Sequence, residues 1–138
     1  MAIYLHNEDI EFPRINKKNT KLWINKVVAY HKYKLGELNY IFTSDEQIIS
    51  INNEYLKHNY FTDVITFDYT DSNIISGDIF ISLETVKSNS IKFNQEFSAE
   101  LNRVIIHGVL HLIGFKDKTE LEAKEMRAQE DIALKFLE

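Results

Sequence analysis

Large apolar residues alternate with other residues along several short stretches of the chain, which is the pattern of half-buried β-strands. Residues 3–5 show it near the N-terminus, and every second residue from Leu38 to Phe42 is large and apolar. Residues 64–68 and 79–82 are rich in β-branched and aromatic side chains, which also favour strands. Turn-forming residues 71–73 lie between these last two stretches, so we expect the two strands to form a hairpin.

Helical spacing and helix-capping residues predict the remaining elements. Asn16 can cap a helix that runs to about Tyr33, with Gly36 ending that unit. Ser44 and Gln47 form a capping box for a second helix, which reaches about Leu56. A third helix is expected to start near Leu83, and a Thr119/Glu122 capping box opens the last helix. A fifth helix is expected from about Phe97 to Ile113. These elements predict one α/β (α+β) domain over residues 1–138, with a small mixed sheet of about four strands and about five helices packed around it.

Composition narrows the class of protein. The chain has 138 residues, of which 44% are hydrophobic and 12% aromatic, and this excludes a disordered protein. It contains no cysteine, so any metal ligands must be His, Asp or Glu. Neither a signal peptide nor an apolar run of membrane-spanning length is visible, so we expect a cytoplasmic protein without a membrane partner.

Charge argues against a protein that binds nucleic acid through a uniformly basic surface. The formal net charge is −5, whereas nonspecific nucleic-acid binders are usually basic. A local basic cleft remains compatible with this total, because charge can be segregated on the surface. Ordinary solvated side chains are the alternative interpretation of the basic residues near the motifs, which are Lys57, His58, Arg103, Lys116 and Lys118.

The strongest candidate for chemistry is the segment from His107 to Asp117, which reads HGVLHLIGFKD. His107 and His111 are four residues apart, so both imidazoles can face one ion from the same side of a helix. Gly114 allows the chain to leave the helix in a left-handed conformation and fold back, which can bring Asp117 in as a third ligand. Two His, one carboxylate and an open position describe a catalytic zinc site better than a structural one. Two alternatives stay open: the histidines can be ordinary surface residues, and Asp117 can be a turn residue before the last helix.

A peptidase is a less favoured interpretation of this segment. Zinc peptidases of the HExxH type carry a Glu directly after the first His as general base, and this chain has Gly108 there. No other residue is an obvious general base. Asp63, at the entry to a predicted strand, is the candidate we retain, although it can equally be a cap for that strand.

Three ordered blocks of sequence resemble the YbeY family of bacterial single-strand endoribonucleases. The His107 segment matches the family signature H-G-x-x-H-x-x-G-[FY]-x-H up to its last position. Residues 62–67, TDVITF, resemble the family block P-T-D-V-L-S-F, and residues 77–82, GDIFIS, resemble G-D-I-x-I-S. The resemblance covers essentially the whole chain.

Two departures from the family pattern bear on the expected site. Asp117 stands where the family has its third His; an anionic ligand leaves less net positive charge on the ion, so we expect greater tolerance of harder ions such as Mn²⁺. Leu56 stands where the family has an arginine after Tyr55. Lys57 or His58 can supply a cation nearby, but a lysine lacks the two-pronged donor geometry of arginine.

The resemblance implies a metal-dependent endoribonuclease that matures the 3′ end of 16S rRNA and serves ribosome quality control. We expect one Zn²⁺ on His107, His111 and Asp117, with Lys57, His58 and Asp63 as catalytic residues. Single-stranded rRNA precursor would be bound with the help of Lys57, Arg103 and Lys116, and the small ribosomal subunit would be a partner. Another metallohydrolase, and a ribosome-associated factor with weak nuclease activity, remain the alternatives.

Overall fold

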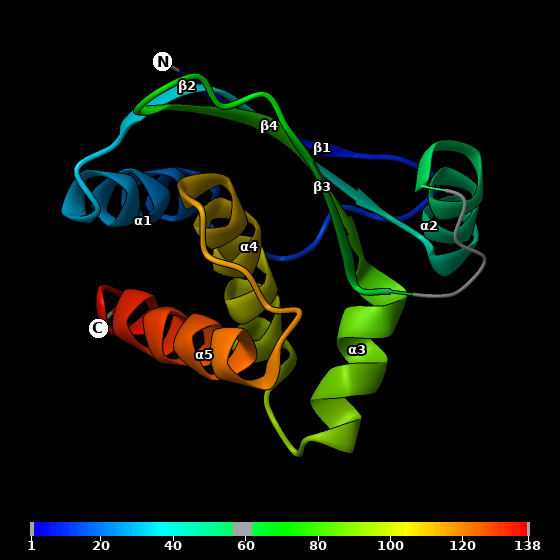
Figure 1. Ribbon diagram of the computed structural model, residues 1–138. Coiled ribbons are helices and arrows are strands. Elements are labelled where there is room, and N and C mark those ends of the chain that lie inside the picture. The colour runs from blue at the N-terminus through cyan, green and yellow to red at the C-terminus, as the bar shows by residue number, and fades with distance from the viewer. Residues whose placement is uncertain (1, 57–61, 138) are drawn as a thin grey trace.

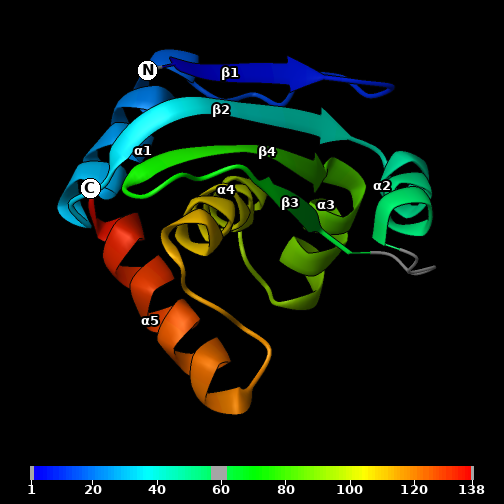
Figure 2. The same ribbon diagram turned by 45° about the horizontal axis from the view of Figure 1, so that its top comes forward.

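A four-stranded mixed sheet, seen in a computed structural model that describes residues 2–56 and 62–137, organises the molecule (Figures 1 and 2). Its strands lie in the order β1-β2-β4-β3, and the sheet is parallel throughout except for the β3–β4 pair. The strand bounds are β1 Ala2–Asn7, β2 Lys34–Thr43, β3 Val64–Asp68 and β4 Ile74–Ser82. This confirms the predicted mixed sheet and the hairpin, in which β3 and β4 pair with Val64 opposite Ile81.

Five α-helices and one π-helical turn complete the described part of the chain. The bounds are α1 Lys17–Tyr30, α2 Asp45–Ile51, η1 Asn52–Leu56, α3 Leu83–Lys92, α4 Phe97–Ile113 and α5 Glu120–Lys135. Side-chain caps begin α1 and α5 as predicted, because Asn16 accepts from the Asn19 N–H and Thr119 and Glu122 form a full capping box. At α2, Ser44 caps the Gln47 N–H, while the Ser44 N–H donates to Asp9. In these described ranges, no helix is both long and apolar enough to cross a membrane.

Helices cover the two faces of the sheet unequally. Helices α1, α4 and α5 lie on one side of the sheet, and α2 lies at its far end beside β3 (Figures 1 and 2). The main core lies between the sheet and α4, where Tyr40 and Ile79 are fully buried; the Tyr40 hydroxyl donates to Ile105 O of α4, and Ile79 faces Gly108. A second, smaller cluster on the opposite face packs Ile48 and Ile51 of α2 against β3. Strand β3 is thus packed on both faces while one of its edges has no neighbouring strand among the described residues.

The structure corrects two predicted boundaries near Gly36. Helix α1 ends at Tyr30, before Tyr33, because Lys32 turns the chain at a positive φ of 64°. Gly36 lies inside β2 and does not end the preceding unit. A Cβ atom on Gly36 would lie 2.5 Å from the Ser76 hydroxyl oxygen, so the absence of a side chain lets β2 approach β4 at an irregular register.

Candidate metal centre and cleft

Helix α4 carries both histidines and packs tightly on the sheet. Gly108, between them in sequence, faces β4, and a Cβ atom there would lie 2.8 Å from Ile79 Cδ1. This close packing turns His107 and His111 to the side of the helix, where their rings meet edge to face with centroids 4.5 Å apart. The predicted placement of two imidazoles on one helix side is therefore confirmed.

The exit from α4 brings Asp117 back to the histidines. Gly114 adopts φ 119°, the left-handed conformation predicted from its sequence position, and the N–H groups of Gly114 and Phe115 both donate to Leu110 O. Such a cap reverses the chain at the helix end. As a result, Asp117 Oδ2 lies 3.2 Å from His107 Nε2 and 3.4 Å from His111 Nε2.

These separations suit one small divalent cation. When ligand atoms lie about 2.0–2.1 Å from a zinc ion, the edges of the tetrahedron measure roughly 3.3 Å. The ligand atoms of His107, His111 and Asp117 all lie within 4.8 Å of one another. Two imidazole nitrogens and a carboxylate oxygen are a donor set that zinc accepts with a fourth position left open. The residues present therefore fit a catalytic type of metal centre.

A buried carboxylate behind His107 fixes the orientation of its ring. Glu130 of α5 is 5% exposed, and its Oε2 lies 2.6 Å from His107 Nδ1. The other oxygen of Glu130 accepts from Arg103 at 2.8 Å, and Arg103 also pairs with the exposed Asp131 at 2.8 Å. With Nδ1 donating to Glu130, Nε2 of His107 is left to face the ion.

The two histidines have opposite electrostatic surroundings. Burial alone would lower the pKa of His107, but the hydrogen bond and charge of Glu130, with Asp117 and Asp63, outweigh it and raise the pKa. Burial lowers the pKa of His111, and the neighbouring His107 charge lowers it further. His111 is therefore the readier of the two to present a neutral nitrogen to a metal.

Asp63 stands beside this centre at the start of β3, and both cavities described below reach it. Burial raises the pKa of its carboxyl group, against the opposing charge of His107. A carboxylate whose pKa is raised in this way is better suited to exchange a proton near neutral pH than an ordinary surface aspartate. Asp63 therefore lines both cavities beside the candidate ligands, and its catalytic role stays a prediction.

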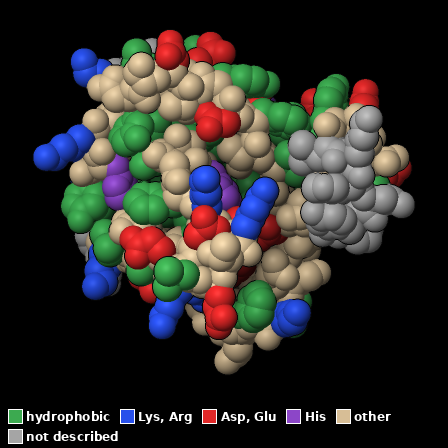
Figure 3. Space-filling model, in the orientation of Figure 1, with side chains coloured by type: hydrophobic (Ala, Val, Ile, Leu, Met, Phe, Trp, Pro, Cys, Tyr) green, Lys and Arg blue, Asp and Glu red, His purple; other side chains and the backbone are tan. Residues whose placement is uncertain are grey.

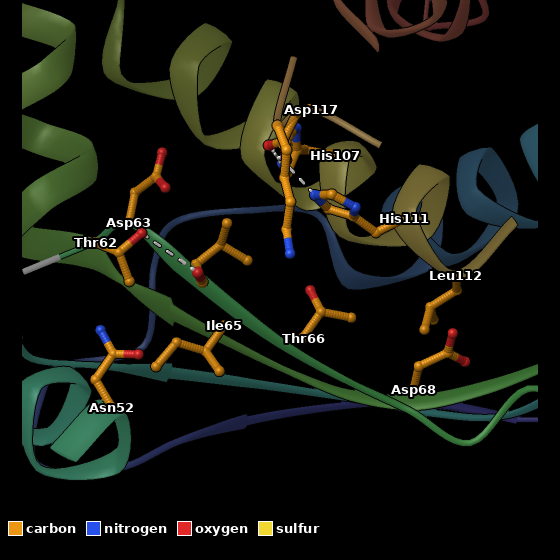
Figure 4. Close-up of a pocket in the computed structure, with 12 residues that line it drawn as sticks. Asn52, Thr62, Asp63, Ile65, Thr66, Asp68, His107, His111, Leu112 and Asp117 are labelled. Atoms are coloured by element: carbon orange, nitrogen blue, oxygen red, sulfur yellow. Dashed lines mark hydrogen bonds and ion pairs between the residues drawn. The ribbon is translucent and has the colours of Figure 1, made fainter. Parts of the chain in front are cut away.

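An open cleft of about 610 Å³ runs from the three candidate ligands along β3 (Figure 4). His107, His111 and Asp117 line it on one side, while Thr62, Thr66 and Asp68 line it along the strand. Lys118 is a cation that lines the cleft. A smaller cavity of about 290 Å³ lies toward α3 and α5 and shares Asp63, His107 and Asp117 with the cleft. Figure 3 shows acidic and basic side chains interspersed on this face.

The other predicted site residues lie in different surroundings. Arg103 is held by Glu130 and Asp131, and Lys116 is exposed and not among the residues that line the cleft. Their contribution to RNA binding stays a prediction. Lys57 and His58 lie outside the described residues, and so does the segment that follows Leu56.

Sequence reasoning missed Glu130 altogether and named Lys118 only as one of the basic residues near the motifs. Glu130 shares the buried stripe of α5 with Met126 and Ala133, at the spacing i, i+4, i+7. A carboxylate on such an apolar stripe signals a buried partner, although the sequence does not say which one. Lys118 carried no comparable signal, because it resembles the other lysines that surround the motif.

The fold and site together define a class: an α/β protein with a candidate His-His-Asp metal centre at one end of an open cleft. Comparison with known proteins then identifies the family. Residues 4–138 match the sequence model of endoribonuclease YbeY, and this chain belongs to that family.

Individual relatives agree with this assignment. The chain is 52% identical over 134 residues to endoribonuclease YbeY of Bacteroides fragilis, covering 97% of this chain and 96% of that protein. It is 49% identical over 137 residues to endoribonuclease YbeY of Parabacteroides distasonis, covering 99% and 96%. Among solved structures, a Thermotoga maritima protein determined in solution superposes with a TM-score of 0.70 at 28% identity, over 99% of this chain and 89% of that one.

Proposed function

We propose that this chain is a zinc-dependent endoribonuclease that cleaves single-stranded RNA, and that residues 1–138 form its one catalytic domain. The observation that carries the proposal is the geometry of His107, His111 and Asp117, whose facing ligand atoms are 3.2 and 3.4 Å apart at the end of an open cleft. Membership of the endoribonuclease YbeY family supplies the class of substrate.

His107, His111 and Asp117 would hold a divalent ion, which when bound would act as a Lewis acid toward a phosphodiester oxygen and lower the pKa of a nucleophile. The protein positions the residues that would bind the ion. Glu130 holds the His107 ring from behind, and Gly114 sets the turn that returns Asp117 to the histidines. Asp63 is our candidate for proton transfer, because its raised pKa and its place in the cleft suit that task. Lys118 offers positive charge to the phosphate backbone in the same cleft.

We infer a physiological role from the family. Single-stranded rRNA precursor is the proposed substrate, with maturation of the 3′ end of 16S rRNA on the small ribosomal subunit in the cytoplasm. Lys57 and His58 remain proposed catalytic cations, with Arg103, Lys116 and Lys57 as proposed RNA contacts. The absence of the family arginine at Leu56 favours a second candidate, a ribosome-associated factor with weak nuclease activity.

A peptidase is the weaker alternative. Position 108, where HExxH peptidases carry their general base, is packed against Ile79, so a Gly108→Glu side chain would clash with β4. A Gly108→Glu variant is therefore a poor probe of peptidase chemistry in this protein.

Metal content measured beside RNA cleavage tests the proposal. The parent protein, His111→Ala and Asp117→Ala are compared by elemental mass spectrometry, and the same samples are incubated with a single-stranded 16S 3′-end substrate and its duplex. His6→Ala is the matched control, because His6 is exposed on the edge strand β1. We expect one zinc per parent chain, loss of metal and cleavage in both ligand variants, and no change in the control.

Other outcomes separate the alternatives. Zinc retained in Asp117→Ala would contradict the third ligand. A parent that binds zinc without cleaving the single strand would favour the ribosome-associated factor. Loading the parent and Asp117→His with Mn²⁺ as well as Zn²⁺ tests which ion the centre prefers. Asp117→His should bind zinc more tightly relative to manganese than the parent does, because imidazole suits zinc and carboxylate suits harder ions.

A further inference from the structure

The free edge of β3 forms one wall of the cleft. The cleft-lining residues include Ile65, which packs with the cluster under α2, and Thr66, which lies on the opposite face of the strand. Successive residues of a strand point to opposite faces of the sheet. A cavity that is lined by both Ile65 and Thr66 must therefore lie against the edge of the strand. Figure 4 shows Ile65 and Asn52 on one side of β3 and Thr66 and the histidines on the other. No described strand pairs with this edge.

The register of the hairpin decides which main-chain groups face the cleft. The Ser82 N–H donates to Asp63 O at 2.9 Å, and the Tyr69 N–H donates to Ser76 O at 2.9 Å. In an antiparallel pair, bonded and non-bonded residues alternate along the strand. Odd-numbered residues of β3 therefore direct their N–H and C=O toward β4, and even-numbered residues direct theirs to the free edge.

Thr66 is the even-numbered position best suited to bind a ligand. At Val64, the N–H donates to the Asp63 carboxylate and the carbonyl accepts from Thr62 at 3.5 Å. Asp68 carries a negative side chain that lines the cleft and repels anions. Thr66 is uncharged, lies between them, and lines the same cleft as His107, His111 and Lys118. Its N–H and C=O together offer one donor and one acceptor.

We propose that the free edge of β3 at Thr66 is a main-chain subsite for the backbone of single-stranded RNA. The Thr66 N–H donates to a phosphate oxygen, and the Thr66 C=O accepts from a 2′-hydroxyl. A strand of RNA presents both groups along its backbone, whereas DNA lacks the hydroxyl. The subsite rests on the proposed function and adds to it the path of the substrate past the metal centre.

Proline at position 66 tests the subsite, because it removes the N–H that faces the cleft and no bond of the β3–β4 ladder. Proline is tolerated on edge strands when its missing N–H would face away from the sheet. Thr66→Val is the matched control, since it keeps the N–H and the branched shape and removes only the hydroxyl. Binding of a fluorescent single-stranded RNA is measured by anisotropy with metal-free protein, and cleavage is then measured with zinc.

We expect Thr66→Pro to weaken RNA binding about tenfold, in line with the loss of one hydrogen bond to a charged group. The catalytic efficiency should fall by a similar factor, mainly through a higher KM, while zinc content and the unfolding temperature stay at the parent values. Thr66→Val should lose much less binding than Thr66→Pro, because it keeps the main-chain N–H. If Thr66→Pro does not fold, an ester in place of the 65–66 amide removes the same N–H without the ring, and the same loss is expected.

Unchanged RNA binding in a folded Thr66→Pro or in the ester variant would overturn the subsite and leave the proposed nuclease function standing. If the parent protein binds an extended peptide and Thr66→Pro loses that binding while it still binds RNA, the RNA subsite is overturned in favour of a peptide ligand. A parent protein that fails to cleave RNA with zinc bound would contradict the proposed function itself, which is a different result.

Discussion

Glu130 illustrates how a residue far from the metal-binding motif in sequence can decide whether a histidine binds metal. An isolated His107 ring could rotate and could carry its proton on either nitrogen. The buried Glu130 removes this freedom by holding Nδ1 at 2.6 Å, and Arg103 in turn holds Glu130 at 2.8 Å. Three side chains in series thus orient one ligand atom.

Removal of Glu130 should weaken metal binding. We expect Glu130→Ala to raise the zinc dissociation constant about 10- to 100-fold, as is typical when the carboxylate behind a ligating histidine is lost. Glu130→Gln should lie between this variant and the parent, because its amide oxygen still accepts from Nδ1 but carries no charge. Competition with a chromophoric zinc chelator measures the constants.

Asp131→Asn is the matched control for this prediction. Asp131 is the neighbouring residue and pairs with the same Arg103, but it makes no contact with His107. Its zinc affinity should stay within about twofold of the parent value. An equal loss in Asp131→Asn and Glu130→Ala would mean that α5 as a whole, and not the Glu130 hydrogen bond, supports the centre.

At the scale of elements, helix α4 depends on its fit to strand β4. Gly108 is the contact point, and the fully buried Ile79 lies where a side chain would have to go. Gly108→Ala should destabilise the protein by about 1–2 kcal/mol, because overpacking outweighs the gain of roughly 1 kcal/mol in helix propensity. Urea unfolding of the metal-free protein measures the change.

The double variant Gly108→Ala with Ile79→Val identifies the cause of the predicted destabilisation. Valine removes Cδ1, the atom nearest to the added methyl group, so Gly108→Ala should cost less in that background. An equal cost in both backgrounds would contradict the contact as the source of the destabilisation.

The bounds of a helix or strand could be predicted from the sequence where its local signals agreed. They were less predictable where pairing between distant strands determines the bounds. Helix α4 has the predicted bounds Phe97–Ile113, since an apolar stripe and Gly114 both mark it. Strand β4 begins at Ile74, five residues before the predicted start at Ile79. Its first half contains Ser76 and Gly77, which look like loop residues and become strand only by pairing with β2 and β3.

At the scale of the whole molecule, the local part of the site was predictable and the long-range part was not. His107, His111 and Asp117 lie within one short segment, so helix geometry and a glycine turn sufficed to bring them together. Glu130 reaches His107 only through the packing of α5 on α4. Thr66 reaches the cleft only because β3 is an edge strand, which depends on the strand order.

The three ligands join a helix to the loop that follows it, so metal binding should stabilise the whole fold. Zinc at 100 times its dissociation constant should add about 2.7 kcal/mol to the free energy of unfolding, provided that the unfolded chain does not bind it. For a domain of this size that corresponds to a rise of roughly 8 °C in the unfolding temperature. Differential scanning calorimetry of the parent protein with zinc, and again after excess chelator, measures the shift.

His111→Ala sets the baseline, because it removes one ligand while the capping bonds that Gly114 and Phe115 make to Leu110 O remain. Its unfolding temperature should respond to zinc by no more than a small part of the parent's shift. Asp117→Ala should behave in the same way if the carboxylate binds the ion. A parent protein that unfolds at the same temperature with zinc and with chelator would contradict the centre, whatever its activity on RNA, because a ligand bound only by the folded state must stabilise that state.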